Sequence, residues 1–430
     1  MLPLSDPWLP RRLSSLRLAE SLVLVLALLN HGCGTCSSIE QQYRAWLTDE
    51  LLITGTGRSP APGGQVHLRL LLGNEVLRTI ASAASGATPF APVRMQRRST
   101  VSDDAPTYLF RAIPTLSNVL IQSDAGQPAL QIALQFNGSV NIERRTDAEE
   151  SVWTSTIQIY APLTLGIESD GASLRVDLRR ATMGPLVSDS TLTNPEDRTT
   201  VDAMLVSELQ RQLNESSDST ALLRVPPIGT GRGRVELRAV ELRQMDERGG
   251  LSLGFVTSLR PHSRSLPATG EVAGPREFRV EMVPDLPEAY ARFLVAGNVV
   301  PRMFDESGQP DADGVWARSI TSLEPAGDRW LARVERWCFR SAPCMRTGAE
   351  LQFSLGTTES RANAPTADAE GDRRFVQSLI PALGSLMTAP ALILASGDTL
   401  DVQLQSVSLA GPSITLRGTM VEGGDGTVQP

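Results

Sequence analysis

The chain has 430 residues, which is more than one ordinary core holds and enough for two domains. Hydrophobic residues make up 41% and charged residues 20%, a composition that excludes intrinsically disordered and multi-span membrane proteins. The formal net charge of −8 argues against nucleic-acid binding, because phosphates require a basic face.

The chain contains no lysine, so all 40 of its basic residues are arginine. A phosphate-binding GxxxxGK[ST] loop, a Schiff-base lysine and an SxxK nucleophile pair each need an ammonium group, so these mechanisms are excluded. The mature chain keeps His67 and His262, and neither lies in a context typical of a catalytic base. We therefore expect a protein that is not an enzyme.

Residues 21–29 form an uncharged apolar run that follows Arg11, Arg12 and Arg17. A basic start followed by a short apolar run is the pattern of a secretory signal peptide. The run is far shorter than the roughly 20 residues of a membrane-spanning helix. We therefore expect residues 1–32 to be a signal peptide.

Gly32 and Cys33 close this segment. A cysteine after a small residue resembles the lipobox of bacterial lipoproteins, in which the thiol receives a diacylglyceryl group and becomes the new N-terminus. Asn30 stands where that family usually has leucine. The resemblance implies lipid attachment at Cys33 and a protein anchored in the cell envelope, at the outer membrane or the periplasmic face. Plain secretion and a retained N-terminal anchor are the alternatives.

Two further cysteines, Cys338 and Cys344, flank a Ser-Ala-Pro turn between two strand-like runs. Cysteines placed in this way across a hairpin are suited to a disulfide in an oxidising compartment. A zinc site would need three or four ligands, and no histidine or further cysteine is close in sequence. We therefore predict a Cys338–Cys344 disulfide, and the role of Cys36 stays open.

Residues 33–64 are predicted to be a tether, because their end (57–64, GRSPAPGG) is rich in proline and glycine. A first domain is expected over residues 65–262, with alternating apolar residues in its strands and apolar stripes on its helices. Asn194 is the predicted N-cap of its long helix. The expected elements are a strand at 65–72, a helix at 75–84, a meander including 129–136, 155–167 and 172–180, a long helix from 194, and a hairpin at 233–259.

A second domain is expected over residues 278–422, after a linker at 263–277. It repeats the order of the first: strand, helix, meander, long helix, hairpin. Its expected elements are a strand at 277–283, a helix at 287–300, strands at 314–323, 329–339 and 350–356, a helix at 372–387 and a hairpin at 398–420.

This doubled order resembles the tubular lipid-binding superfamily, the fold of bactericidal/permeability-increasing protein. The residues that carry the resemblance are the helix Leu205–Leu213 with the hairpin RVELRAVEL to LSLGF, and the helix Phe375–Met387 with LDVQLQSVSL to SITLRG. The resemblance covers residues 65–420. It implies an α+β fold of two domains, each a curved antiparallel β-sheet wrapped on a long helix, with an apolar groove for acyl chains.

The apolar stripes of the predicted helices are the candidates to line such a groove. They consist of Val76, Leu77, Ile80, Leu205, Leu209, Leu213, Phe375, Leu379 and Leu383. We expect the protein to bind a lipid or other amphiphile there, without a cofactor and without transforming it. The alternative is a structural or adhesive β-rich lipoprotein of the envelope, in which these side chains pack as closed cores.

One acidic loop is a candidate ion site. Asp305, Asp311 and Asp313 lie in DESGQPDADG and offer oxygen ligands suited to calcium. Their spacing breaks the EF-hand order, and an ordinary acidic loop is the alternative.

Overall fold

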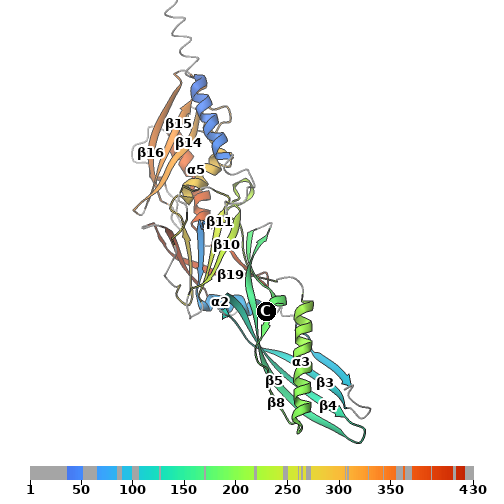
Figure 1. The fold of residues 1–430 in the computed structure, drawn as a ribbon. Coiled ribbons are helices and arrows are strands. Elements are labelled where there is room, and N and C mark those ends of the chain that lie inside the picture. The colour runs from blue at the N-terminus through green and yellow to red at the C-terminus, as the bar shows by residue number, and fades with distance from the viewer. Residues whose placement is uncertain are drawn as a thin grey trace, which may run out of the picture. The chain divides into compact units, whose positions relative to one another are not determined.

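The computed structural model describes residues 36–51, 65–84, 90–98, 106–124, 127–168, 171–216, 220–245, 250–259 and most of 261–421. The gaps in the last range are 263–264, 268–272, 306, 308, 328, 342, 355–361, 364–369, 389 and 410–412. The fold is α+β, with open antiparallel sheets and a minority of helices (Figure 1). The predicted signal peptide and Cys33 lie outside the described residues.

The predicted internal repeat is present in the order of the elements. The first repeat consists of β1 (Leu68–Leu72), α2 (Asn74–Ala84), β2 (Val93–Arg98), β3 (Thr107–Asp124), β4 (Gln127–Glu143), β5 (Ala148–Glu168), β6 (Gly171–Val176), β7 (Thr182–Met183), β8 (Val187–Ser190), α3 (Pro195–Glu215), β9 (Thr220–Val225), β10 (Leu237–Gln244) and β11 (Leu251–Thr257). The second consists of β12 (Glu277–Met282), α4 (Leu286–Ala296), β13 (Met303–Phe304), β14 (Trp316–Ala326), β15 (Arg329–Cys338), β16 (Met345–Phe353), β17 (Ala362–Asn363), α5 (Glu370–Leu386), β18 (Leu392–Leu394), β19 (Thr399–Leu400), β20 (Val402–Ser408) and β21 (Ile414–Met420).

The two repeats meet in a six-stranded sheet with the order β10-β11-β1-β12-β21-β20. The opening strands β1 and β12 pair at its centre, with Leu70 opposite Val280. The closing hairpin of each repeat flanks its own opening strand, so the order is symmetric about the centre. Both hairpins also carry a register shift near the middle of their first strand, in β10 and in β20. The duplication therefore extends from the element order to the pairing.

Each meander builds a separate sheet. The first forms most of a ten-stranded sheet with the order β19-β18-β9-β6-β5-β4-β3-β2, in which β7 and β8 pair with β5. The second forms a five-stranded sheet, β13-β14-β15-β16-β17. Strands β18 and β19 come from the second repeat but pair in the sheet of the first. The repeats are thus interleaved.

The compact units of the chain differ from the predicted domains. One unit contains residues 1–57 and 287–384, and the other contains 58–286 and 385–430. The second repeat is divided between the two, because its strands β12 and β18–β21 complete sheets begun by the first repeat. Sequence periodicity identified the repeats, but it does not show which strands are shared.

The predicted linker at 263–277 is fastened to the central sheet where the structure describes it. The Leu266 amide donates to the Val66 carbonyl at 2.8 Å, and the Glu75 amide donates to the Pro275 carbonyl at 2.9 Å. A Cβ on Gly73 would lie 2.0 Å from the Gly274 carbonyl oxygen, so the two backbones approach closely. This segment is therefore a strap along β1 rather than a free connection.

The predicted tether also differs from the structure, because residues 36–51 form a helix. Ile39 and Tyr43 pack with Ala317 and Trp337 in a buried cluster. The Tyr43 and Trp337 ring centroids lie 5.7 Å apart. This N-terminal helix is thus part of the first compact unit, and residues 33–35 and 52–64 of the predicted tether lie outside the described residues.

The disulfide prediction has the wrong partner. Cys344 bonds to Cys36 at the start of the N-terminal helix, with the Cα atoms 5.1 Å apart, and Cys338 is a buried free thiol. The predicted pair was based on the closeness of Cys338 and Cys344 in the chain, and the role of Cys36 was left open. The bond instead links residues 308 positions apart.

The meander of the first repeat begins earlier than predicted. Strand β3 (Thr107–Asp124) was missed, although it pairs with β4 along its full length. Its polar residues interrupt the apolar alternation, and a register shift between Leu116 and Asn118 breaks the period of two. A strand is therefore missed by its apolar alternation when a bulge shifts which residues face the core.

Peptide mapping without reduction is expected to recover Cys36 linked to Cys344, and Cys338 as a thiol that alkylates after denaturation. Cys36→Ser is expected to lower the free energy of unfolding by about 2–5 kcal/mol, because the bond restricts the unfolded chain. Cys338→Ser is the control and keeps the linked peptides. Recovery of Cys338 linked to Cys344 in the native protein contradicts the structure.

Candidate functional site

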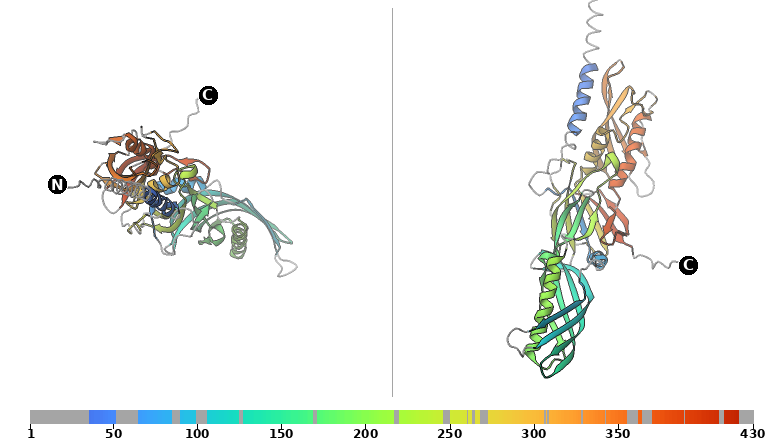
Figure 2. Two further views of the ribbon diagram at one scale, coloured as in Figure 1. Left: turned by 90° about the horizontal axis from the view of Figure 1, so that it is seen from above. Right: turned by 90° about the vertical axis from the view of Figure 1, so that its right-hand side faces the viewer.

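The long helix α3 lies beside the curved sheet formed by β3, β4 and β5 (Figure 2). Asn194 caps it as predicted, because its Oδ1 accepts from the Glu196 amide at 2.9 Å. Val201, Leu205 and Leu209 are buried on the side of the helix that faces the sheet. The opposing strands bury aromatic residues, including Phe110 and Trp153, whose ring centroids lie 5.0 Å apart.

The sheet is much longer than the helix that covers it. Strand β4 has 17 residues and β5 has 21, which correspond to about 56 and 69 Å at about 3.3 Å per residue. The 21 residues of α3 rise only about 32 Å at about 1.5 Å per residue. The remaining sheet packs against α2 and β10. The apolar face of the sheet is therefore covered in two parts, one by α3 and one by α2 and β10. We call the region beside the C-terminal half of α3, where the cover by α3 ends, the seam.

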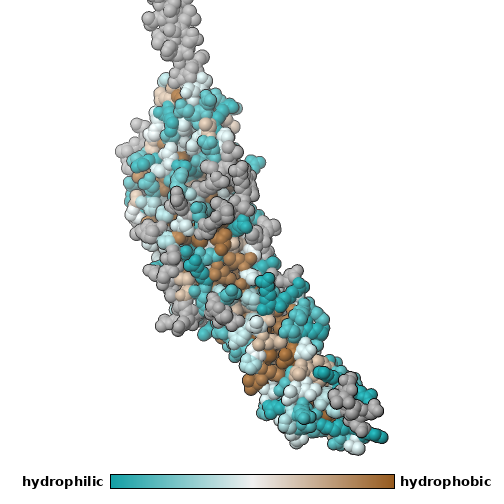
Figure 3. All heavy atoms as spheres, viewed as in Figure 1, coloured by the Kyte–Doolittle hydropathy of each residue, from teal (hydrophilic) through white to brown (hydrophobic). Residues whose placement is uncertain are grey.

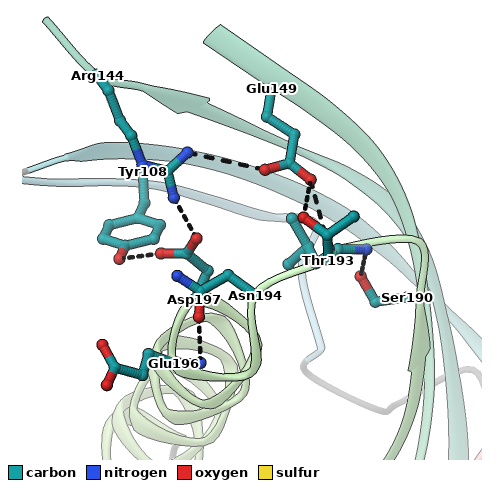
Figure 4. Close-up of polar contacts among 9 residues, drawn as sticks. Tyr108, Arg144, Glu149, Ser190, Thr193, Asn194, Glu196 and Asp197 are labelled. Atoms are coloured by element: carbon teal, nitrogen blue, oxygen red, sulfur yellow. Dashed lines mark hydrogen bonds and ion pairs between the residues drawn. The ribbon is translucent and has the colours of Figure 1, made fainter. Parts of the chain in front are cut away.

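The N-terminal end of α3 is fixed by a buried carboxylate (Figure 4). Asp197, the third residue of the helix, accepts from the Tyr108 hydroxyl at 2.7 Å and also accepts from Arg144. The Nη1 atom of Arg144 in turn lies 3.7 Å from the Oε2 atom of Glu149, so the two side chains form an ion pair. Asp197 is only 3% exposed. Because Tyr108 is on β3 and Arg144 follows β4, this clamp ties the helix to two strands.

The C-terminal end is held by hydrogen bonds of Gln212 and Arg179. The Oε1 atom of Gln212 accepts a hydrogen bond from the Ala91 amide at 3.2 Å. Arg179 Nε donates to the Ser216 carbonyl at 3.0 Å. A neutral hydrogen bond such as that of Gln212 contributes roughly 0.5–1.5 kcal/mol, and one from a charged group such as Arg179 contributes roughly 1.5–3 kcal/mol. The two ends of the helix are therefore held differently, the start by a buried carboxylate and the end by backbone carbonyl and amide groups.

The same clamp recurs on the long helix of the second repeat. Asp372 is the third residue of α5 and is 0% exposed. It accepts from Arg318 Nε of β14 at 2.7 Å and from Arg336 Nε of β15 at 2.6 Å. The sequence signal was an aspartate at the third helical position of both repeats, but its partners are fixed only by the fold.

All nine predicted groove residues are buried to 0–1% exposure. Those of α2 and α3 belong to one compact unit, and those of α5 belong to the other. Phe375 packs edge-on against Phe304, with centroids 6.1 Å apart. These side chains are buried from solvent in the structure, and their role as the lining of an apolar groove stays a prediction.

A pocket of about 620 Å³ lies instead at the seam, between α3 and β7. None of the nine predicted residues lines it. It is lined by Met183, Ala203, Val206, Ser207, Gln210, Arg211, Asn214 and Glu215. The sequence signal was the pair Ala203 and Val206 on the otherwise polar face of α3, which the stripe analysis passed over.

Apolar residues also reach the surface of the unit that holds this pocket. Figure 3 shows hydrophobic residues gathered near the places where Figure 1 labels β10 and β5. Val240 of β10 is 39% exposed. Single exposed apolar side chains are normal on soluble proteins, so these areas support no site by themselves.

The acidic loop does not gather its carboxylates around one point. Asp305 accepts from the Gln309 amide at 2.8 Å, Asp311 accepts from the Asp313 amide at 2.9 Å, and Asp313 lies 3.6 Å from Arg340. Within the described ranges no three His, Cys, Asp or Glu side chains are placed to hold a metal ion. The carboxylates of this loop form turns instead.

Two other polar residues have structural surroundings. His67 is 5% exposed, its Nδ1 accepts from the Thr257 amide at 3.3 Å, and burial lowers its pKa. Ser252 stands in a GxSxG sequence, Gly250–Gly254. In hydrolases this spacing marks a turn between strand and helix, but here the serine is buried within β11.

None of the helices in the described ranges is long and apolar enough to cross a membrane.

No family model and no curated protein matches the chain. Solved structures similar to it include lipopolysaccharide binding protein, at 10% identity over 82% of this chain and 98% of that chain, with a TM-score of 0.29. P47 of Clostridium botulinum E1 matches at 10% identity over 83% and 99%, with a TM-score of 0.32. P47 from Clostridium botulinum A2 matches at 11% over 82% and 97%, also at 0.32. Scores this low transfer neither a ligand nor a residue role to this chain.

Asp197→Asn is expected to lower the free energy of unfolding by about 3 kcal/mol, because it removes the charge that faces Arg144 in a buried place. Tyr108→Phe is expected to cost about 2 kcal/mol, the value of one hydrogen bond to a charged group. Urea unfolding of the full chain measures both. Glu150→Gln, an exposed change on the same sheet, is the control and stays within about 0.5 kcal/mol of the parent. Equal stability of Asp197→Asn and the control contradicts the clamp.

Proposed function

We propose that this chain is an exported protein of the cell envelope that binds an amphiphile, without transforming it, at the seam beside the C-terminal half of α3. The observation that carries the proposal is the mismatch between the long apolar sheet and its short helix, with a pocket at the place where the helix cover ends. An acyl chain that enters there meets Met183 of β7 and the apolar side chains Ala203 and Val206 of α3.

Binding requires the C-terminal half of α3 to move, because Leu209 and Leu213 are fully buried. The two ends of the helix are held differently. Its start is held by the buried Asp197 clamp, and its end is held by hydrogen bonds between Gln212 and Ala91 and from Arg179 to the Ser216 carbonyl. Each CH₂ group that leaves water contributes about 0.8 kcal/mol, so a chain of ten contributes about 8 kcal/mol toward separating helix and sheet.

The anchoring part of the proposal rests on Cys33 and its nearness to a fixed point. Cys36 is three residues further on and is bonded to Cys344. Three residues span at most about 11 Å. A lipid on Cys33 would therefore hold the first compact unit directly at the membrane surface, rather than at the end of a long tether.

A second candidate function is structural: an envelope protein with closed cores that binds no amphiphile. The full burial of all nine predicted groove residues favours this alternative. In it the pocket beside β7 is a surface concavity, and α3 never leaves the sheet.

Substitution of Ala203 separates the two candidates. Ala203 lines the pocket and is exposed, so Ala203→Trp fills the seam while the stability changes by less than about 0.5 kcal/mol. We expect the full chain to bind a fluorescent fatty acid saturably, and Ala203→Trp to weaken that binding at least tenfold. Titration followed by fluorescence measures both.

Thr199→Trp is the matched control, because Thr199 is exposed on the same helix and lies outside the pocket. It is expected to bind like the parent. Absence of saturable binding by the parent, together with a native mass spectrum free of co-purified lipid, supports the structural alternative. Equal weakening by both tryptophans contradicts the seam as the site.

A further inference from the structure

The clamp on α5 differs from the clamp on α3 in its charge. In the first repeat Asp197 and Glu149 face one cation, Arg144, and the third partner is the neutral Tyr108. In the second repeat one anion, Asp372, faces both Arg318 and Arg336. Among the described residues the first group therefore has one negative charge in excess, and the second has one positive charge in excess.

The excess charge of the second group is buried. Arg318 is 3% exposed, and its guanidinium carbon lies 4.5 Å from the centre of the Phe304 ring. Its Nη1 atom has no hydrogen-bond partner. Burial lowers the pKa of Arg318, and Arg336 lowers it further, against the opposing effect of Asp372. A buried guanidinium nitrogen without an acceptor is costly, because it has lost its hydrogen bonds to water and the contact with the Phe304 ring supplies no acceptor atom.

The surroundings of this group suit an anion. The group lies at the start of α5, a helix of 17 residues whose first amides carry a partial positive charge. Glu370 in the first turn is paired with Arg373 and Arg374, so the helix start adds no net negative charge beyond Asp372. The side chain of Arg336 is 23% exposed and gives the group a path to solvent.

We propose that Arg318 and Arg336 at the start of α5 form a binding site for an oxyanion, a phosphate or carboxylate group. A tetrahedral or planar oxyanion accepts from the outer nitrogens of both guanidinium groups and supplies the negative charge that the group lacks. Charge-assisted contacts of this kind are among the stronger hydrogen bonds in proteins. The site lies in the first compact unit and does not depend on the pocket beside α3.

The oxyanion has two chemical sources, a free phosphate and the headgroup of a lipid. Titration of the full chain with inorganic phosphate at constant ionic strength, and with soluble dioctanoyl phosphatidic acid below its critical micelle concentration, separates them. Isothermal titration calorimetry gives both affinities. Both titrations are repeated in Ala203→Trp, which blocks the proposed amphiphile pocket. In that variant, binding of both ligands with similar affinity identifies a site for the oxyanion alone, and at least tenfold tighter binding of the phosphatidic acid identifies a lipid headgroup site.

Arg336→Gln is expected to weaken either ligand at least tenfold, and Arg336→Lys to recover part of the loss, because the lysine restores the charge but not the fork of donors. Arg144→Gln removes the equivalent arginine of the first repeat and is expected to leave both affinities unchanged. Arg336 is partly exposed, so its variants remain folded where those of Arg318 would not, and circular dichroism verifies this. Saturable binding that Arg336→Gln abolishes and Arg144→Gln retains supports the site. Absence of binding by the parent, or equal affinities in Arg336→Gln and the parent, overturns it.

Discussion

The pairing of β1 with β12 is the interaction on which the rest of the fold depends. The register places Arg69 opposite Glu281, and the two side chains form a buried ion pair at 3.2 Å. Arg69 Nη1 also donates to the Pro267 carbonyl at 2.8 Å. A slip of one residue would set Arg69 opposite Val280 and leave both charges buried without partners, which costs several kcal/mol. The ion pair thus specifies one register at the point where the repeats meet.

The two repeats hold their long helices in the same way but with different partners. Each long helix is tied to its own meander through an aspartate at the third helical position, Asp197 in one case and Asp372 in the other. The partners have diverged, since a tyrosine and an arginine serve the first helix and two arginines serve the second. As a result, α3 is clamped through one arginine and a tyrosine. The start of α5 instead carries an excess of buried positive charge at Arg318 and Arg336. The proposed amphiphile and oxyanion sites follow from that divergence.

Features that depend on residues close in the chain were predicted correctly from the sequence. Features that depend on contacts between distant segments were not. The cap at Asn194, the alternation in β4 and β5, and the doubled order of elements all follow from residues close in the chain. The Cys36–Cys344 bond, the strap at 263–277 and the exchange of β18 into the first sheet depend on segments far apart in the chain. The apolar stripes correctly marked buried residues, but a stripe does not distinguish a closed core from a groove. The pocket residues lie on the opposite, mostly polar face of α3.

Hydrogen exchange followed by mass spectrometry tests the shared central sheet most directly. If the repeats meet at β1 and β12, peptides that cover Leu68–Leu72, Glu277–Met282 and Ile414–Met420 exchange slowest and open together as one cooperative unit, and the Leu266 amide of the strap is protected with them. Rapid exchange across 263–277, with the peptides on its two sides opening at different denaturant concentrations, would show two independent domains on a free linker and would contradict this account.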